Sequence, residues 1–166
     1  MKTQPSQVQS SAGSKPVLVV GAGPVGLVAA LELARQGWSI RLFEKLLVRS
    51  ELSKAIGINP RSLDLLEASG VTTRLLDEGV RFKGVRVHAE SRCLFSILFE
   101  WLEHPRRFLL GLPQARTGSV LEQRLTELGI PVERGRELLD LEQDEEEVRA
   151  RITWIEPFAT SGSRRL

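Results

Sequence analysis

The chain has 166 residues, of which 42% are hydrophobic and 27% charged, and its formal net charge is +2. This length is that of one domain or part of one, and the composition is ordinary for a soluble globular protein with a buried core. No basic stripe is interleaved with aromatic residues, which argues against a nucleic-acid-binding protein. No apolar run approaches the ~18 residues of a membrane span.

The two ends of the chain differ in composition from its middle. Residues 1–15 are rich in Ser and Gln and lack the apolar core of a secretory signal, so we expect a disordered leader. Residues 157–166 are expected to form an irregular tail, which leaves one domain over residues 16–156. Cys93 is the single cysteine, which excludes an internal disulfide and fits a reducing, cytoplasmic compartment.

A glycine-rich turn follows the first predicted strand, the apolar run of residues 17–20. It consists of Gly21, Ala22, Gly23, Pro24, Val25 and Gly26. Gly21 would permit a sharp turn, Gly23 would let the backbone approach a phosphate, and Gly26 would let a helix pack close to the strand. The N-terminus of that helix would direct unpaired N–H groups at the anion. The pattern predicts a site for a dinucleotide pyrophosphate, and its alternative is a glycine turn without a ligand.

The segments after the turn match the rest of a dinucleotide-binding unit. A helix is predicted over residues 24–36, and Gly37 would end it. A second apolar strand, residues 39–43, ends in Glu44, which lies 18 residues after Gly26. That spacing is close to the ~20 residues expected of an acidic residue that accepts hydrogen bonds from ribose hydroxyls. The order of these segments predicts an α/β fold with a Rossmann-like parallel sheet and helices.

The remainder of the chain predicts further helices and a small antiparallel β element. After a long connection, Asn59 would cap a helix that begins at Pro60 and ends at Gly70, with Leu63, Leu65, Leu66 and Ala68 on its apolar face. The other elements are expected in this order: a helix over 72–78, a hairpin of strands 84–88 and 93–99, a strand within 108–112, a helix over 114–128, a parallel strand at 131–133, and strands 137–141 and 148–155 joined by an acidic turn.

Three blocks of sequence resemble the N-terminal part of the FAD-dependent aromatic hydroxylases, the single-component flavoprotein monooxygenases. The first block combines residues 17–26 with 42–45, the second is residues 53–62 with the helix after them, and the third is Leu112-Pro113-Gln114. The first block occurs in many FAD and NAD proteins, whereas the second and third in this order are much more specific. The resemblance extends from Pro16 to Ile152.

The resemblance implies a cofactor site and an activity. The six residues of the turn would bind the FAD pyrophosphate, and Glu44, followed by Lys45, would hold the adenosine ribose. Lys54 takes the place of a family arginine near the cofactor, and Gln114 would lie close to the ribityl chain. Lysine keeps the charge of arginine but loses its bidentate fork. Family members use NAD(P)H and O₂ to hydroxylate an aromatic or similarly electron-rich small molecule, and no catalytic residue is assigned here.

The chain also departs from the family, and the departure leaves two alternatives open. Family members are considerably longer and carry later Asp-Gly and Gly-Asp motifs at the cofactor, whereas this chain contains neither dipeptide. One alternative is a truncated, non-catalytic FAD- or dinucleotide-binding module that a partner chain completes. The other is an NAD-dependent oxidoreductase.

Other reactive or charged residues are given structural interpretations. His88 is expected on a strand face and His104 in a loop, because no catalytic set and no metal-ligand spacing includes them. The carboxylates of residues 140–147 are interpreted as a solvated hairpin tip rather than a metal site. The apolar run of residues 93–101 is interpreted as a buried strand, with a partner surface or a face left bare as alternatives.

Three arginines are candidates for contact with a phosphate. They are Arg49, Arg61 and Arg116, and each is interpreted as a surface charge.

Overall fold

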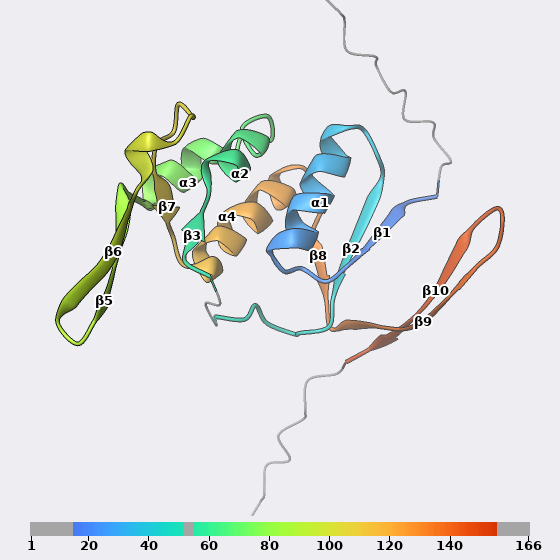
Figure 1. Cartoon of the computed structure of the whole chain (residues 1–166). Helices are drawn as coiled ribbons and strands as arrows, with labels where there is room; N and C mark the ends of the chain where they lie inside the picture. The colour runs from blue at the N-terminus through green and yellow to red at the C-terminus, as the bar shows by residue number, and fades with distance from the viewer. Residues whose placement is uncertain (1–14, 52–54, 156–166) are drawn as a thin grey trace, which may run out of the picture.

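A parallel sheet and two long helices form the centre of the fold. The computed structural model describes residues 15–51 and 55–155 (Figure 1). Strands β1 (Val17–Val20), β2 (Ile40–Glu44) and β8 (Val132–Arg134) pair in the order β1-β2-β8, and both pairings are parallel. Helices α1 (Pro24–Arg35) and α4 (Gln114–Glu127) pack against each other beside this sheet. The parallel sheet, α1 and the strand expected at residues 131–133 are therefore confirmed.

The core lies between the two helices and the sheet. α1 buries Leu27 and Leu31, α4 buries Leu121 and Leu125, and β2 contributes Leu42, all at 0–1% exposure. These two leucines of each helix are four positions apart, which places them on one face. Gly37, with φ of +86°, follows α1 as expected, although the helix itself ends at Arg35. The core thus fixes the start of α1 against the end of β2.

A second, antiparallel sheet extends the same core. Strands β3 (Gly57–Ile58), β7 (Leu109–Gly111) and β4 (Val80–Phe82) pair in the order β3-β7-β4. β3 and β4 were not predicted from the sequence, because runs of two and three residues carry no periodicity. Leu110 of β7 is fully buried in the same cluster as the α1 and α4 residues.

Two short helices contribute Leu63 and Leu75 to the buried cluster that contains Leu110 of β7. α2 (Pro60–Leu65) begins as predicted, with the Asn59 side chain accepting a hydrogen bond from the Ser62 N–H at 2.8 Å. α3 (Thr72–Glu78) has the bounds predicted for it. The predicted extent of α2 was wrong, since the helix ends at Leu65 rather than near Gly70. Leu65 is 58% exposed and Ala68 is also exposed, so neither lies on the apolar face.

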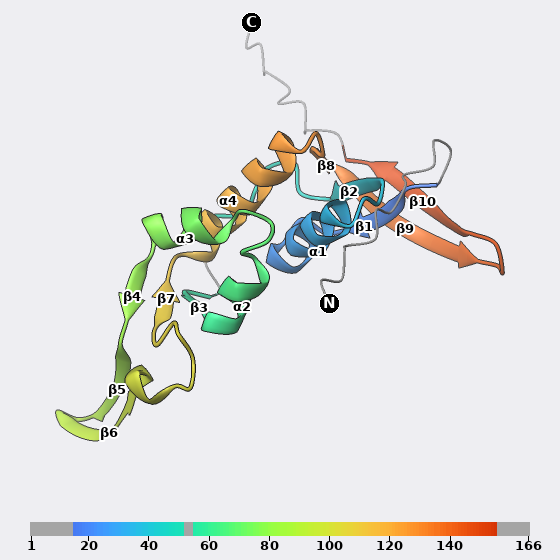
Figure 2. The ribbon, with the colours of Figure 1, turned by 90° about the horizontal axis from the view of Figure 1, so that it is seen from above.

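Two hairpins project from opposite ends of the molecule (Figure 2). The predicted hairpin of β5 (Gly84–Ala89) and β6 (Arg92–Leu98) is confirmed, and its turn residues Glu90 and Ser91 have positive φ. Phe99 lies outside β6, in the short 3₁₀ helix η1 (Phe99–Trp101). The interpretation of this run as a buried strand was wrong, because every residue of β6 is exposed.

The second hairpin carries the acidic turn. It consists of β9 (Arg136–Gln143) and β10 (Val148–Trp154), which pair antiparallel. In the turn, Asp144 accepts hydrogen bonds from the N–H groups of Glu146 and Glu147 at 2.9 and 2.8 Å. Within residues 15–51 and 55–155, no group of three or more potential metal-ligating side chains occurs. The same part of the chain contains no helix long and apolar enough to cross a membrane.

Candidate functional site

The glycine turn joins β1 to α1 by a close approach of two backbone segments. Gly21 has φ of +99°, a conformation that favours glycine, and its N–H donates to the Phe43 carbonyl at 2.7 Å. A Cβ added at Gly26 would lie 1.9 Å from the Gly21 carbonyl oxygen, where no real contact can exist. The expected roles of Gly21 in the turn and of Gly26 in helix packing therefore agree with the geometry.

Gly23 stands at the open side of the turn. It is the N-cap residue of α1, in an extended conformation with φ of −73°, and no side chain caps the helix there. A Cβ added at Gly23 would meet no atom within 4 Å. The first turn of α1 contains no acidic residue. Its N-terminus is thus accessible to an anion, which the helix dipole and the unpaired N–H groups would attract.

Glu44 connects the end of β2 to the glycine turn. One carboxylate oxygen accepts from the Ala22 N–H at 2.8 Å, and the other accepts from the Leu46 N–H at 2.9 Å. A carboxylate has about four acceptor sites, so both oxygens retain capacity for a hydroxyl donor. The carboxylate predicted to bind a ribose therefore lies beside the turn predicted to bind a pyrophosphate.

A cleft of about 240 Å³ lies where these groups meet. Its walls come from the turn residues Ala22, Gly23 and Pro24, the segment after β2, the first turns of α4, and Arg134 at the end of β8. Glu44 and Gln114 both line the cleft, although they lie far apart in the sequence. The cleft lies at the carboxyl ends of β2 and β8, the edge at which open parallel sheets bind ligands.

A second hollow, about 330 Å³ in volume, continues from the first. Pro24 and Gln114 line both hollows, whereas Val25 and Ile58 line only the second. The wall is held in place by backbone hydrogen bonds from Leu112 N to the Ile56 carbonyl at 2.8 Å and from Gln114 N to the Ala55 carbonyl at 3.1 Å. The second and third sequence blocks therefore meet in space, next to the first.

Not all of the predicted cofactor-binding residues line the first cleft. Val25 lines only the second hollow. Gly21, Gly26 and Lys45, which is exposed, do not line the first cleft. Lys54 lies outside the described residues. In contrast, no sequence pattern singled out Arg134, which lines the cleft, or Glu122, which pairs with Arg134 at 2.9 Å. Arg134 lies on a short strand and Glu122 on a helix, and neither charge belongs to a sequence motif, so only the structure shows that they pair.

Three other candidates, His88, His104 and Arg116, do not line the cleft. His104 Nδ1 accepts from the Arg106 N–H at 2.9 Å, so Nε2 donates to Asp64 on α2 at 2.7 Å. This hydrogen bond, with the nearby Arg106 guanidinium, lowers the pKa of Asp64 below its ordinary value of 3.8. His88 is exposed on β5, as expected for a strand face, and Arg116 pairs with Glu78 at 2.7 Å. The contacts of His104 fasten a loop to α2.

Comparison with known proteins identifies the family. The FAD binding domain family matches residues 14–162. Pentachlorophenol 4-monooxygenase of Sphingobium chlorophenolicum is 35% identical over 152 residues, which are 90% of this chain and 28% of that protein. Anhydrotetracycline monooxygenase of Streptomyces rimosus is 34% identical over 137 residues, which are 82% of this chain and 27% of the relative.

Solved structures agree with these relatives. An anhydrotetracycline hydroxylase from Streptomyces rimosus superposes with a TM-score of 0.74 at 31% identity, over 84% of this chain and 28% of that one. Aklavinone-11 hydroxylase in complex with FAD and aklavinone gives a TM-score of 0.71 at 28% identity, over 82% of this chain and 29% of that one. The chain therefore spans between a quarter and a third of the length of these proteins. The resemblance carried by the three sequence blocks is confirmed: the chain belongs to the FAD binding domain family, the domain that binds FAD in flavin-dependent aromatic monooxygenases.

Proposed function

We propose that this chain binds FAD through the cleft at the glycine turn and supplies the nucleotide-binding part of a flavin-dependent monooxygenase. The observation that carries the proposal is the open space at Gly23, which lies at the uncapped N-terminus of α1 and faces a cleft that Glu44 also lines. A diphosphate needs close backbone approach and N–H donors, and a ribose needs a carboxylate acceptor. The residues present fit both requirements.

Each residue of the site has a proposed role. The turn residues Gly21 to Gly26 would hold the pyrophosphate, and Gly23, which has no side chain, would leave space for it. Glu44 would accept hydrogen bonds from the hydroxyls of the adenosine ribose. Gln114, which lies between the two hollows, would donate its side-chain amide to the polyol that links the nucleotide to the flavin. Lys45 and Lys54 remain candidates for the charge around the cofactor.

The proposed activity is that of the longer relatives. When bound, FAD would supply hydride acceptance from NAD(P)H and the O₂ chemistry that hydroxylates an aromatic or related small molecule. The residues of this chain would bind and orient the nucleotide end of the cofactor. We place the chain in a reducing compartment such as the cytoplasm, because Cys93 is exposed and forms no disulfide.

Replacement of Gly23 by valine tests the binding site separately from the fold. The backbone at residue 23 is already in a conformation that valine adopts, and its Cβ would meet no neighbour, so the unfolding midpoint without ligand should not change. The added side chain should occupy the space of the diphosphate and abolish FAD binding, measured by flavin fluorescence and by the thermal shift that FAD confers on the unaltered chain. FAD affinity retained in Gly23→Val would contradict the model of the turn.

The unaltered chain also distinguishes the alternatives. FAD binding with NAD(P)H oxidation supports the monooxygenase, whereas FAD binding without turnover supports a binding module that another polypeptide completes. Binding of NAD but not FAD would favour an NAD-dependent oxidoreductase.

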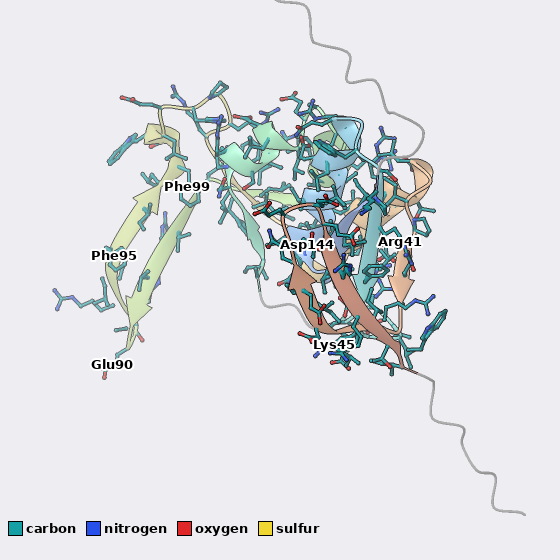
Figure 3. The ribbon with its side chains drawn as sticks, turned by 90° about the vertical axis from the view of Figure 1, so that its right-hand side faces the viewer. Arg41, Lys45, Glu90, Phe95, Phe99 and Asp144 are labelled. Carbon is teal, nitrogen blue, oxygen red and sulfur yellow. The ribbon has the colours of Figure 1, made fainter. Side chains whose placement is uncertain are left out.

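A specific feature favours the partner-completed module as the second candidate. In the β5–β6 hairpin, Val85 pairs with Ile97 and Val87 with Phe95, so these four side chains share one face, while Arg86 and Ser96 lie on the other. Phe95 and Ile97 are 52% and 50% exposed. Figure 3 shows Phe95 and Glu90 on this hairpin, well away from Arg41 and Lys45 of the nucleotide-binding half.

An isolated two-stranded hairpin is marginal in water, and an apolar face of this kind is ordinarily covered. Phe95→Ser should therefore reduce self-association or capture of a partner in analytical ultracentrifugation without changing FAD affinity. If the unaltered chain and Phe95→Ser both sedimented as monomers, the hairpin would no longer support a partner-completed module.

A further inference from the structure

Three charged side chains meet at the wall of the cleft. They are Arg49 in the segment after β2, Glu122 on α4 and Arg134 at the end of β8, and both arginines line the cleft. Arg134 Nη2 lies 2.9 Å from each carboxylate oxygen of Glu122. The Nε of Arg49 lies 3.3 Å from one of the same oxygens. One carboxylate thus holds two guanidinium groups beside the site.

The two arginines are held to different degrees. Arg134 and Glu122 have side chains that are 20% and 19% exposed, and their contacts have the length of a strong ionic hydrogen bond. Arg49 is 40% exposed and its contact with Glu122 is longer and involves a single oxygen. An ion pair as exposed as this one contributes little to stability. The Arg49 guanidinium can therefore leave Glu122 at small cost, while Arg134 continues to pair with the glutamate.

The charge balance of the site favours such a movement. A diphosphate carries two negative charges, and Glu44 adds another beside the glycine turn. Backbone N–H groups and the helix dipole supply partial charges, so a mobile cation at the wall would offset the repulsion. Arginine suits this task because its planar fork binds phosphate oxygens in pairs.

We propose that Arg49 is a diphosphate-binding residue of this site, which Glu122 holds at the cleft wall until the ligand arrives and which then turns to the phosphate oxygens. Arg134 is the fixed partner that keeps Glu122 in position. The inference rests on the proposed FAD site, and it assigns a phosphate contact to a residue that would otherwise be only a surface charge.

The test compares Arg49→Gln with the control Arg74→Gln. Arg74 pairs with Glu127 at 2.7 Å, has a side chain that is 37% exposed and lies outside the cleft, so both variants lose one positive charge from a surface ion pair. Isothermal titration of the full chain would measure the Kd for FAD, ADP and adenosine. In Arg49→Gln, FAD and ADP should bind roughly tenfold more weakly, as expected for one ionic hydrogen bond, and adenosine should bind unchanged.

Two further measurements separate a phosphate contact from a structural effect. The affinity of Arg49→Gln for ADP should depend less steeply on salt than that of the control, and Arg49→Lys should recover part of the lost affinity. ADP affinity in Arg49→Gln equal to that of the control, or an equal loss for adenosine and ADP, would overturn the inference and leave the FAD site standing. If the unaltered chain bound neither FAD nor ADP, the proposed function would fail and this inference with it.

Discussion

Gly26→Ala is the most direct test of how α1 is joined to β1. The added Cβ would lie 1.9 Å from the Gly21 carbonyl oxygen and 3.1 Å from the carbon of that carbonyl. Carbon–oxygen contacts in proteins begin near 3.3 Å, so the turn and the helix would have to separate by about 1.4 Å. The obstructing atom belongs to the backbone, and Gly21 is itself held by a hydrogen bond to Phe43. Relief by a side-chain rotation is therefore not available.

The magnitude follows from the cost of overpacking a fixed structure. Such overpacking destabilises by about 1–3 kcal/mol, and because backbone must move we expect a value of about 2 kcal/mol. For a domain of this size that corresponds to a fall in melting temperature of about 5 °C.

Gly118→Ala is the matched control for this substitution. Gly118 lies in the interior of α4, and a Cβ there would meet only Leu27 Cδ1, at an ordinary distance of 3.9 Å. Glycine in the middle of a helix is about 1 kcal/mol less favourable than alanine. The same chemical change should therefore stabilise the protein at residue 118 and destabilise it at residue 26.

Urea unfolding followed by far-ultraviolet circular dichroism, without ligand, would measure both free energies of unfolding. If Gly26→Ala unfolded at the same urea concentration as the unaltered chain, or a higher one, then close packing of α1 on β1 would not be the reason for glycine at residue 26.

Three further predictions concern stability and the cofactor site. Asp64→Asn should lower the unfolding midpoint at pH 7, because His104 and Arg106 depress the folded-state pKa of Asp64. That stabilisation is present above the ordinary pKa of 3.8 and is lost as the pH falls below it, so the midpoints of Asp64→Asn and the unaltered chain should converge in acid. A constant difference between the two midpoints across the pH range would refute the reasoning. Asn59→Ala should cost about 1 kcal/mol in urea unfolding, because it removes the acceptor for the Ser62 N–H, whereas Asn59→Ser should retain most of the stability. Glu44→Ala should weaken binding of adenosine as well as of ADP, unlike Arg49→Gln, because the carboxylate is assigned to the ribose; loss of ADP binding alone would contradict that assignment.

The sequence predicted the nucleotide-binding half of the fold well, because the signals there are local. The helix after the glycine turn needs only an apolar face and an end at Gly37, and the parallel strands need only short apolar runs. The hairpin of β5 and β6 was also predicted correctly, from two apolar runs separated by a short polar turn. The domain bounds of 16–156 and the roles of the individual site residues stay predictions.

The elements that the sequence did not predict depend on partners far away along the chain. β4 has three residues and becomes a strand because Arg81 pairs with Leu110 of β7. The environment of β6 was misjudged for a related reason, since an apolar run indicates that a strand is to be covered but not by what. Within the described residues nothing covers it, and its side chains are exposed.

The candidate site shows the same limit more sharply, because its residues come from segments that do not adjoin in sequence. The glycine turn and Glu44 belong to one βαβ unit with a known spacing, so their association could be predicted. Arg49, Glu122 and Arg134 have no such spacing, and they meet because the core that includes Leu27, Leu42 and Leu121 packs α4 beside the sheet that contains β8. The parts of a dinucleotide site that lie within one βαβ unit, such as the glycine turn and Glu44, can therefore be predicted from the sequence. The cluster of Arg49, Glu122 and Arg134 depends on tertiary packing, so the sequence alone did not reveal it.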